Sequence, residues 1–458
     1  MKKIHSLICI FTPLVFLLPI YSPAQENPRW IKTAYTPSPA SRINDGFFLT
    51  PSLGWVVNGV GQIHKTTDAG ATWSRVLTRS GTHFRSVGFL DPLHGWAGCL
   101  GIGDPNNPSS TDQNILYRST DGGTTWTPVT ALSGPTPRGF CGMHVLNDTV
   151  INAVGRVRGP ATFYRTIDAG NTWEATDMSP HAAGLIDVYF FSPDTGIAVG
   201  LTNAIHDNSS GVILFTSDAG KTWEKRFTTT RVGEWCWKLS FPSRNVGYVS
   251  LQRNSLSPIY FLKTTDGGAT WSEKLFRNAW YFVQGIGFAN ESVGWIGGWS
   301  GEPMYETRNG GESWSSIGIG RRVNRFRMFN ESSGYAVGDS VYKYGPLTPV
   351  GILADAAERS GRFAVAQNFP NPFNPSTIIH VDIPEEAFVS VRVFNMLGQE
   401  VITLINQVRS PGVLAVEWDG VNEEGERLPS GSYLYHVRMR SLSGHGTYGE
   451  TKRMVMVR

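Results

Sequence analysis

An eight-residue pattern recurs six times in this chain, and it restricts the fold more than any other feature. The first copy is "TTDAGATW" at residues 66–73, and the later copies read "STDGGTTW", "TIDAGNTW", "TSDAGKTW", "TTDGGATW" and "TRNGGESW". The central position of the copies falls at Asp68, Asp121, Asp168, Asp218, Asp266 and Asn309. Because successive copies are 43 to 53 residues apart, the chain is predicted to be a repeat protein with one structural unit per copy.

Each unit is predicted to contain four strands. A β-like run such as "QIHK" or "ILYR" comes directly before the pattern, and a fourth strand starts at its Trp. Upstream lie a Gly-aromatic or Gly-apolar strand, such as the one at Gly54-Trp55, and an apolar inner strand. The third unit has "INAVG" in place of the Gly-led strand. Four strands in 40–50 residues are typical of a β-propeller blade.

The seventh unit is incomplete, and its missing strand is predicted at the other end of the propeller. "RMFNESSGYAVGDSVYKYG" (327–345) has three strands but lacks the Asp pattern and the Trp strand. "RWIKTAY" (29–35) resembles "TWSRVLT" (72–78), and no blade precedes it. We therefore expect 29–35 to pair with 341–345 and to close the ring without an open edge. The fold class predicted for residues 25–345 is an all-β, seven-bladed β-propeller.

The repeated Asp is interpreted as a turn residue. Asp-x-Gly suits a short hairpin loop, since Gly allows positive φ and the carboxylate accepts hydrogen bonds from turn N–H groups. Asn309 replaces Asp in the sixth copy, and Asn is also a good turn residue. One catalytic centre cannot use six copies spread round a ring. No catalytic, cofactor-binding or metal-binding residue is predicted here.

These copies resemble the Asp-box, or BNR, repeat, whose pattern is Ser/Thr-x-Asp-x-Gly-x-Thr-Trp. Sialidases, sortilin-type receptors, some xyloglucanases and the photosystem II assembly and stability factors carry this repeat. The resemblance covers residues 29–345, and "GWVVNGVGQIHKTTDAGATW" is most similar to the photosystem II factors, which are seven-bladed propellers. In these families the box lies away from the ligand face, so the resemblance implies no enzyme by itself.

The two ends of the chain predict export. Lys2, Lys3, an apolar run over 7–21 and Ser22-Pro23-Ala24 are typical of a signal peptide over residues 1–24; a membrane anchor is the alternative. No later segment is long and apolar enough to span a bilayer. Cys99, Cys141 and Cys236 form an odd number without metal spacing, so we expect buried free thiols.

Residues 346–362 depart from the repeat and are interpreted as a linker, and residues 363–458 as a small immunoglobulin-like β-sandwich. Strands are expected at "TIIHVDI", "VSVRVFNMLGQEVITL" with a turn at Leu397-Gly398, "GVLAVEWDG", "LPSGSYLYHVRM" and "KRMVMVR". "QNFPNPFNPST", "VFNMLGQEV", "WDG" and "SGSYLY" resemble the type IX secretion sorting domain. That family implies a Gram-negative bacterium, passage through the periplasm, and binding of the type IX machinery to residues 363–458. A plain adhesion module is the alternative.

The ligand face is predicted opposite the Asp-boxes, where the blade-to-blade loops meet the loops between second and third strands. Two longer loops, 101–114 and 202–211, are expected on that face. The candidate ligand residues are Arg42, Arg85, Arg138, Arg231, Trp235, Trp237, Arg321, Arg322 and Arg325. Guanidinium groups suit planar anions. A solvated, mildly basic rim and an active site are the alternatives.

The function predicted from the sequence is an exported, non-enzymatic propeller scaffold, secreted or at the cell surface, that binds a protein or glycan without a cofactor. The net charge of +3 does not suggest a nucleic-acid partner. The alternative is a glycan-active hydrolase of the sialidase or glucanase type, which needs two neighbouring carboxylates. The carboxylates considered are Asp104, Asp112, Asp187, Asp207 and Glu234, and nothing in the sequence pairs two of them. A photosystem II assembly label would rest on repeat similarity only.

Overall fold

The computed structural model describes residues 28–33, 41–104, 108–135 and 138–345, and residues 363–457 except 366, 369, 370, 372, 375 and 445. The signal peptide predicted over 1–24 and the linker predicted over 346–362 lie outside the described residues. The chain divides into two compact units, Met1–Thr348 and Pro349–Arg458. Each unit is described by itself.

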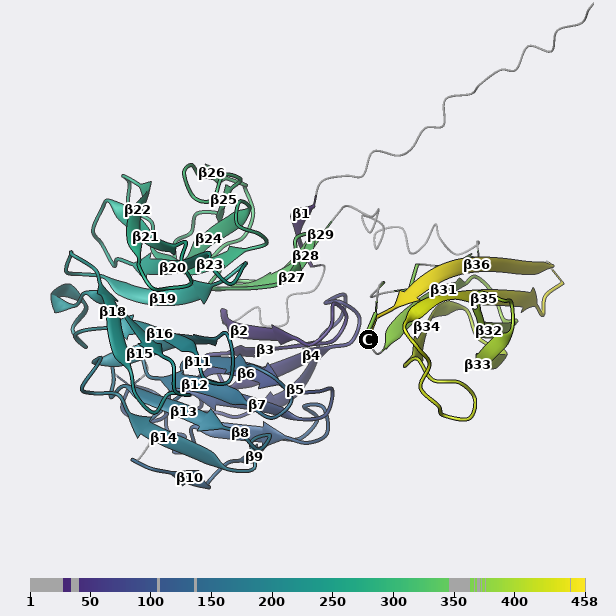
Figure 1. Cartoon of the computed structure of the whole chain (residues 1–458), viewed down its shortest axis with the longest axis horizontal. Helices are drawn as coiled ribbons and strands as arrows, with labels where there is room; N and C mark the ends of the chain where they lie inside the picture. The colour runs from purple at the N-terminus through teal and green to yellow at the C-terminus, as the bar shows by residue number, and fades with distance from the viewer. Residues whose placement is uncertain are drawn as a thin grey trace, which may run out of the picture. The chain divides into compact units, whose positions relative to one another are not determined.

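The first unit is a seven-bladed β-propeller, which confirms the predicted fold (Figure 1). The first two blades consist of β2 (Ile43–Phe48), β3 (Gly54–Asn58), β4 (Gln62–Thr66) and β5 (Ser74–Thr78), and of β6 (Phe84–Phe89), β7 (Gly95–Cys99), β8 (Leu116–Ser119) and β9 (Thr127–Pro128). The third and fourth blades consist of β11 (Gly142–Val145), β12 (Ile151–Gly155), β13 (Thr162–Thr166) and β14 (Trp173–Asp177), and of β15 (Gly184–Phe190), β16 (Gly196–Leu201), β17 (Gly211–Thr216) and β18 (Glu224–Thr228). The fifth and sixth blades consist of β19 (Trp235–Ser240), β20 (Gly247–Gln252), β21 (Ile259–Thr264) and β22 (Ser272–Arg277), and of β23 (Val283–Phe288), β24 (Gly294–Gly298), β25 (Tyr305–Thr307) and β26 (Ser315–Ser316). The seventh blade comprises β27 (Arg325–Asn330), β28 (Ser333–Val337), β29 (Val341–Gly345) and β1 (Arg29–Lys32).

The ring closes through β1, as the sequence predicts. β1 runs antiparallel to β29, with Trp30 opposite Tyr344 and Lys32 opposite Tyr342. Figure 1 shows the purple β1 beside the green β28 and β29 of the last blade. One feature is not predicted: the third blade has a fifth strand, β10 (Leu132–Ser133), which pairs in parallel with β14.

Close packing within each blade explains the Gly that opens most second strands. A Cβ atom added at Gly54 would lie 2.3 Å from the ring of Phe48 on the neighbouring inner strand. Gly95 stands in the same relation to Phe89, at 2.4 Å. The ring of Phe89 also stacks on Trp55 of the preceding blade, with centroids 3.4 Å apart. The Gly-aromatic pattern therefore marks the place where an inner-strand ring covers the second strand, and in the case of Phe89 that ring also contacts the preceding blade.

The second unit is a two-sheet β-sandwich, as predicted. One sheet has the order β30 (Ala364–Val365), β31 (Thr377–Ile383), β34 (Gly412–Trp418), and the other has the order β33 (Glu400–Arg409), β32 (Ala387–Asn395), β35 (Gly431–Ser441), β36 (Thr447–Met456). Strands β31 and β32 alternate buried and less buried positions, so one face of each covers a shared core around Trp418 and Tyr435.

Helix is almost absent from the described residues. The only helical element among them is a 3-10 turn, η1 (His206–Asn208), in the predicted long loop over 202–211. No helix in the described part of the chain has the length and apolar character needed to cross a bilayer. Cys99, Cys141 and Cys236 are buried free thiols, as the sequence predicts.

Candidate functional site

The Asp-boxes join the third and fourth strands of their blades and are hydrogen-bonded turns. In the first box, Asp68 accepts from the Thr66 hydroxyl at 2.8 Å and from the Thr72 N–H at 2.9 Å. The Thr66 hydroxyl in turn accepts from the Gly70 N–H at 2.9 Å, and Gly70 has φ +83°. The Trp of the box adds a further bond in four copies, where its Nε1 donates to the carbonyl of the Gly three residues before it.

The face opposite the boxes contains the central pocket, a cavity of about 530 Å³. Its walls come from the first residues of inner strands, from the loops before those strands, and from the ends of second strands with the loops that follow them. The polar and aromatic lining residues are Arg42, Arg85, Arg158, Ser41, Asn44, Gln252, Asn254, Gln284, His83, Trp235, Trp237, Phe282 and Trp299. No described residue lining this pocket is an Asp or Glu.

Two buried arginines in the pocket carry positive charge without an ion-pair partner among the described residues. Arg42 donates from Nη1 to Gln284 Oε1 at 2.5 Å, and Arg85 donates from Nη1 to Asn44 Oδ1 at 3.4 Å. Both side chains are only 6% exposed, and the Nε of each lacks a hydrogen-bond partner in the described structure. Burial lowers the pKa of Arg42 well below its usual value, the neighbouring charges of Arg85 and Arg322 lower it further, and Asp339 opposes the shift. An anion in the pocket would relieve this repulsion.

Each pocket arginine lies over an indole ring. The guanidinium carbon is 4.1 Å from the ring centroid in the Arg42–Trp299 pair, and the Arg85–Trp237 and Arg158–Trp235 pairs have distances of 5.3 Å and 5.5 Å. The rings hold the guanidinium planes in position and exclude water from one side of each. Trp235 and Trp237 have Nε1–H donors without an acceptor in the described structure. The pocket thus combines cations, aromatic surfaces and amide side chains.

The structure gathers some of the predicted ligand residues and separates others. Arg42, Arg85, Trp235 and Trp237 line the pocket. Arg322 is close by, 5.2 Å from the Trp299 ring, although its Nε pairs with Asp339 at 2.5 Å. Arg138 and Arg321 are exposed and do not line the pocket, nor do Arg231 and Arg325.

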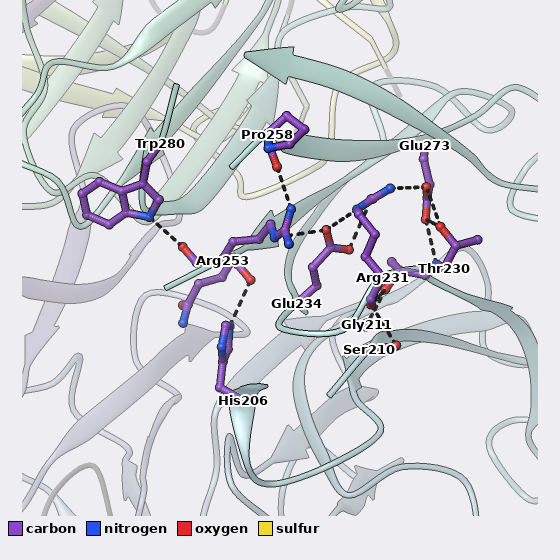
Figure 2. Close-up of polar contacts among 12 residues, drawn as sticks. His206, Ser210, Gly211, Thr230, Arg231, Glu234, Arg253, Pro258, Glu273 and Trp280 are labelled. Atoms are coloured by element: carbon purple, nitrogen blue, oxygen red, sulfur yellow. Dashed lines mark hydrogen bonds and ion pairs between the residues drawn. The ribbon is translucent and has the colours of Figure 1, made fainter. Parts of the chain in front are cut away.

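Arg231 belongs to a network of ion pairs, shown in Figure 2, whose arginines and glutamates do not line the pocket. It pairs with Glu234 and Glu273, each at 2.6 Å, and Arg253 is 3.5 Å from Glu234. Burial raises the pKa of Glu234, and the two arginines oppose this shift. The charge of Arg231 is therefore neutralised by its own neighbours. The network supports loop 202–211, whose His206 packs edge-on against Trp235 with ring centroids 4.9 Å apart.

Arg325 lies in the channel at the centre of the ring instead of on the ligand face. Its Nη1 and Nη2 donate to the two oxygens of Asp187 at 2.9 and 3.0 Å, and its Nε donates to Asp45 at 2.9 Å. Burial acts to raise the pKa of Asp187, but Arg325 and Lys238 hold it at about 2. Arg325 is the first residue of the inner strand β27, whereas Arg321 and Arg322 belong to the loop before that strand.

The remaining carboxylates considered from the sequence have different surroundings. Asp112 is bound by Arg79 at 2.8 Å and by the hydroxyls of Thr82 and Tyr117. Asp104 is buried and Asp207 is exposed. Among the described residues, no three His, Cys, Asp or Glu side chains are grouped to hold a metal ion.

Sequence reasoning missed Arg158, Trp299 and the amide residues of the pocket. Arg158 and Trp299 follow β12 and β24, in the loops between second and third strands. The sequence predicts those loops on the ligand face, so the Arg and Trp residues within them could have been included among the candidate ligand residues. The amides Gln252 and Gln284 have no sequence signal that separates them from surface residues.

Comparisons with known proteins agree with the fold of the two units. The BNR/Asp-box repeat family matches residues 117–128, and the FlgD Ig-like domain family matches residues 373–443. No curated protein matches the chain. Solved structures that match include YCF48 bound to D1 peptide (19% identity, 69% of this chain and 96% of that chain, TM-score 0.50) and YCF48 from Cyanidioschyzon merolae (18%, 69% and 98%, 0.52).

An enzyme structure matches to a similar extent. It is a catalytically inactive virginiamycin B lyase from Staphylococcus aureus with quinupristin (9% identity, 70% of this chain and 99% of that chain, TM-score 0.50). At these identities the likeness shows the fold alone, and the same fold holds binding proteins and enzymes. The chain is thus a β-propeller with Asp-box repeats, followed by an immunoglobulin-like domain of the FlgD type.

Proposed function

We propose that this chain is an exported, non-enzymatic β-propeller that binds an anionic group of a protein or glycan in the central pocket. The observation that carries the proposal is the pair of buried arginines, Arg42 and Arg85, without a carboxylate partner among the described residues. A buried charge without a counter-charge is costly, and a carboxylate-bearing ligand would supply that charge. The guanidinium fork suits a planar carboxylate.

The aromatic rings of the pocket fit the same interpretation. Indole surfaces pack against sugar rings and against apolar side chains, while the amides of Gln252 and Gln284 offer both donors and acceptors. The similar propeller YCF48 has been solved with D1 peptide bound, which supports a protein ligand for this fold. A glycan with an acidic sugar is the other ligand of the proposed class.

The hydrolase alternative finds less support. Glycoside hydrolysis needs two carboxyl groups about 5–9.5 Å apart beside the substrate, whereas the described pocket wall holds none. Asp112, Asp187 and Glu234 are each bound by arginine elsewhere. The pocket chemistry therefore favours holding an anion over cleaving a glycosidic bond.

The binding proposal is tested with the purified protein lacking residues 1–24. An array of acidic and neutral glycans and a library of peptides with free or amidated C-termini would be screened, with tryptophan fluorescence as the confirming titration. We expect acidic ligands to bind and their neutral counterparts to fail. Arg42→Gln combined with Arg85→Gln should weaken binding at least tenfold.

Arg138→Gln is the matched control, because it removes an exposed arginine that does not line the pocket. If Arg138→Gln weakens binding as much as the pocket variant does, the ligand is held by a general basic rim and the pocket proposal is wrong. Hydrolysis of any bound glycan would restore the enzyme alternative.

Export is the second part of the proposal. The predicted signal peptide at 1–24 would deliver the chain to the periplasm, and residues 363–458 would direct it through the type IX machinery to the surface or medium. The test is cell fractionation of a host that has this machinery, with the full chain and with a chain ending at residue 345. The truncated chain should stay in the periplasm, and a periplasmic reporter fused to residues 363–458 should leave the cell. Equal export of both chains would overturn this part.

A further inference from the structure

A second cavity lies in the channel, toward the end at which the inner strands finish, which is the face of the Asp-boxes. This channel cavity has a volume of about 200 Å³ and is lined by the inner strands of blades three to seven. Its charged and polar lining includes His144, Asp187, Arg325 and Arg327. None of these residues lines the central pocket, so the two cavities are separate sites.

The described part of the channel holds one more cation than carboxylates. Arg325, Arg327 and Lys238 face Asp45 and Asp187. Arg325 makes the closest ion pairs of the three cations, with three hydrogen bonds to the two carboxylates. The Nζ of Lys238 is 3.7 Å from Asp187. The backbone N–H group of Val87 donates to Asp45, and that of Leu239 donates to Asp187. The two carboxylates therefore face three cations, and two of these cations, Lys238 and Arg327, have only long contacts with a carboxylate, at 3.7 and 3.6 Å.

Of these two cations, only Arg327 lines the cavity. Its Nε donates to the Gly46 carbonyl at 3.0 Å, and its Nη2 is 3.6 Å from Asp45, too long for a hydrogen bond. Nη2 has no hydrogen-bond acceptor in the described structure. Burial lowers the pKa of Arg327 and the charge of Arg325 adds to this effect, while Asp45 and Asp187 oppose it. Arg327 thus has its one carboxylate contact at 3.6 Å, a side chain that is 25% exposed, and a place in the lining of the cavity.

His144 offers a second donor. Its Nδ1 accepts from the Phe190 N–H at 3.1 Å, so the neutral ring carries its proton on Nε2. Burial, followed by the charge of Arg327, lowers the pKa of His144 to about 4, and the ring is neutral near pH 7. A neutral imidazole N–H adds a hydrogen bond without adding charge.

The other walls are apolar. Tyr189, Phe241, Phe288, Phe326, Met143 and Met328 line the cavity. Such walls favour the hydrocarbon part of a ligand. The volume lies below the usual range of about 300–1,000 Å³ for pockets that hold drug-sized ligands, so the ligand must be small.

We propose that the channel cavity binds a short-chain aliphatic monocarboxylate, with its carboxylate on the Arg327 guanidinium and the His144 Nε2–H and its alkyl chain against the aromatic and methionine walls. One negative charge matches the single excess cation of the channel. This site is distinct from the central pocket and does not depend on the ligand proposed there.

The test is isothermal titration of the folded protein lacking residues 1–24 with butyrate and with butyramide, in chloride-free buffer at pH 7. Butyrate should bind with one site per chain, and butyramide, which has the same shape without the charge, should not. Arg327→Gln should weaken butyrate binding at least tenfold. Arg327→Lys keeps the charge but loses the two-pronged guanidinium, so its butyrate affinity should lie between those of the unaltered protein and Arg327→Gln. Circular dichroism and thermal melting establish that each variant is folded.

Two control variants distinguish the channel cavity from other arginine sites of the propeller. Arg244→Gln removes an arginine that stacks on nearby Phe191 but does not line the cavity, and it should leave butyrate affinity unchanged. Arg42→Gln alters the central pocket and should also leave it unchanged. Absence of butyrate binding to the unaltered protein at 10-millimolar concentrations (about 3 kcal/mol or less of binding free energy), or equal binding of butyramide, would overturn the proposal. Loss of binding in Arg42→Gln alone would assign the butyrate to the central pocket instead.

Discussion

At the scale of the residue, the Asp-box shows one carboxylate performing the same structural task in successive blades. Asp168 accepts from the Thr166 hydroxyl at 2.8 Å, the Thr172 N–H at 2.9 Å and the Thr172 hydroxyl at 2.6 Å. The bonds from Thr172 hold the pKa of Asp168 below its usual range. In the sixth copy Asn309 keeps the geometry, because its Nδ2 donates to the Ser313 hydroxyl at 2.9 Å. The Ser313 hydroxyl accepts a hydrogen bond where the Thr172 hydroxyl donates one, so an amide can replace the carboxylate.

Asp168→Ala should lower the free energy of unfolding of the propeller by about 1 kcal/mol, since it removes three hydrogen bonds at a solvent-exposed turn. Asp168→Asn should cost less than half as much, because the Thr172 hydroxyl can accept from the new amide as Ser313 does. The measurement is urea unfolding followed by tryptophan fluorescence. Identical midpoints for Asp168→Ala and the unaltered protein would mean that the carboxylate does not stabilise the turn.

At the scale of the element, β1 is a four-residue strand that determines whether the ring is closed. Its Trp30 is 5% exposed and packs edge-on against Trp295 and Phe326, with ring centroids 5.2 and 5.7 Å away. The backbone of β1 pairs with β29 and covers what would otherwise be an open sheet edge. A short segment far away in the sequence therefore completes both the hydrogen bonding and the aromatic packing of the last blade.

Trp30→Ala should lower the free energy of unfolding by about 3–5 kcal/mol, the usual cost of removing a buried indole. Trp280→Ala is the matched control, since Trp280 is 41% exposed, and it should cost much less. Both variants would be compared by urea unfolding and by light scattering for association through the exposed β29 edge. Equal stability of the two variants would contradict a closing role for β1.

At the scale of the whole molecule, the propeller encloses neutral histidines together with ionised carboxylates. Burial, followed by the charge of Arg75, lowers the pKa of His64 to about 4, and burial with the charge of Arg327 gives His144 the same value. Asp187 and Asp112 have pKa values of about 2 because arginine and hydroxyl partners outweigh the effect of burial. Protons therefore bind the unfolded chain before they bind the folded one.

The melting temperature should fall in two stages as the pH is lowered. The unfolded histidines take up protons near pH 6.5, while His64 and His144 stay neutral until about pH 4, so stability is lost between these values. Asp187 and Asp112 then lose their ion pairs between about pH 4, the unfolded value, and pH 2. Calorimetry from pH 8 to pH 2 would measure both stages, and His64→Leu should reduce only the first. A melting temperature that stays constant from pH 7 to pH 4 would disprove the histidine stage.

The sequence by itself determined the repeat, the four-strand blades, the Asp-box turns, the strand that closes the ring and the sandwich strands. These features depend on local turn chemistry and on the alternation of side chains along a strand, which neighbouring residues carry. Only the tertiary structure decided which arginines share a site. Arg322 and Arg325 are three residues apart, yet one lies beside Trp299 and the other is bound by Asp187 in the channel. Ring closure brings Arg42 into contact with Gln284, which is 242 residues away in the sequence. The relative position of inner strands across the channel depends on the whole ring, so it cannot be predicted from a local sequence pattern.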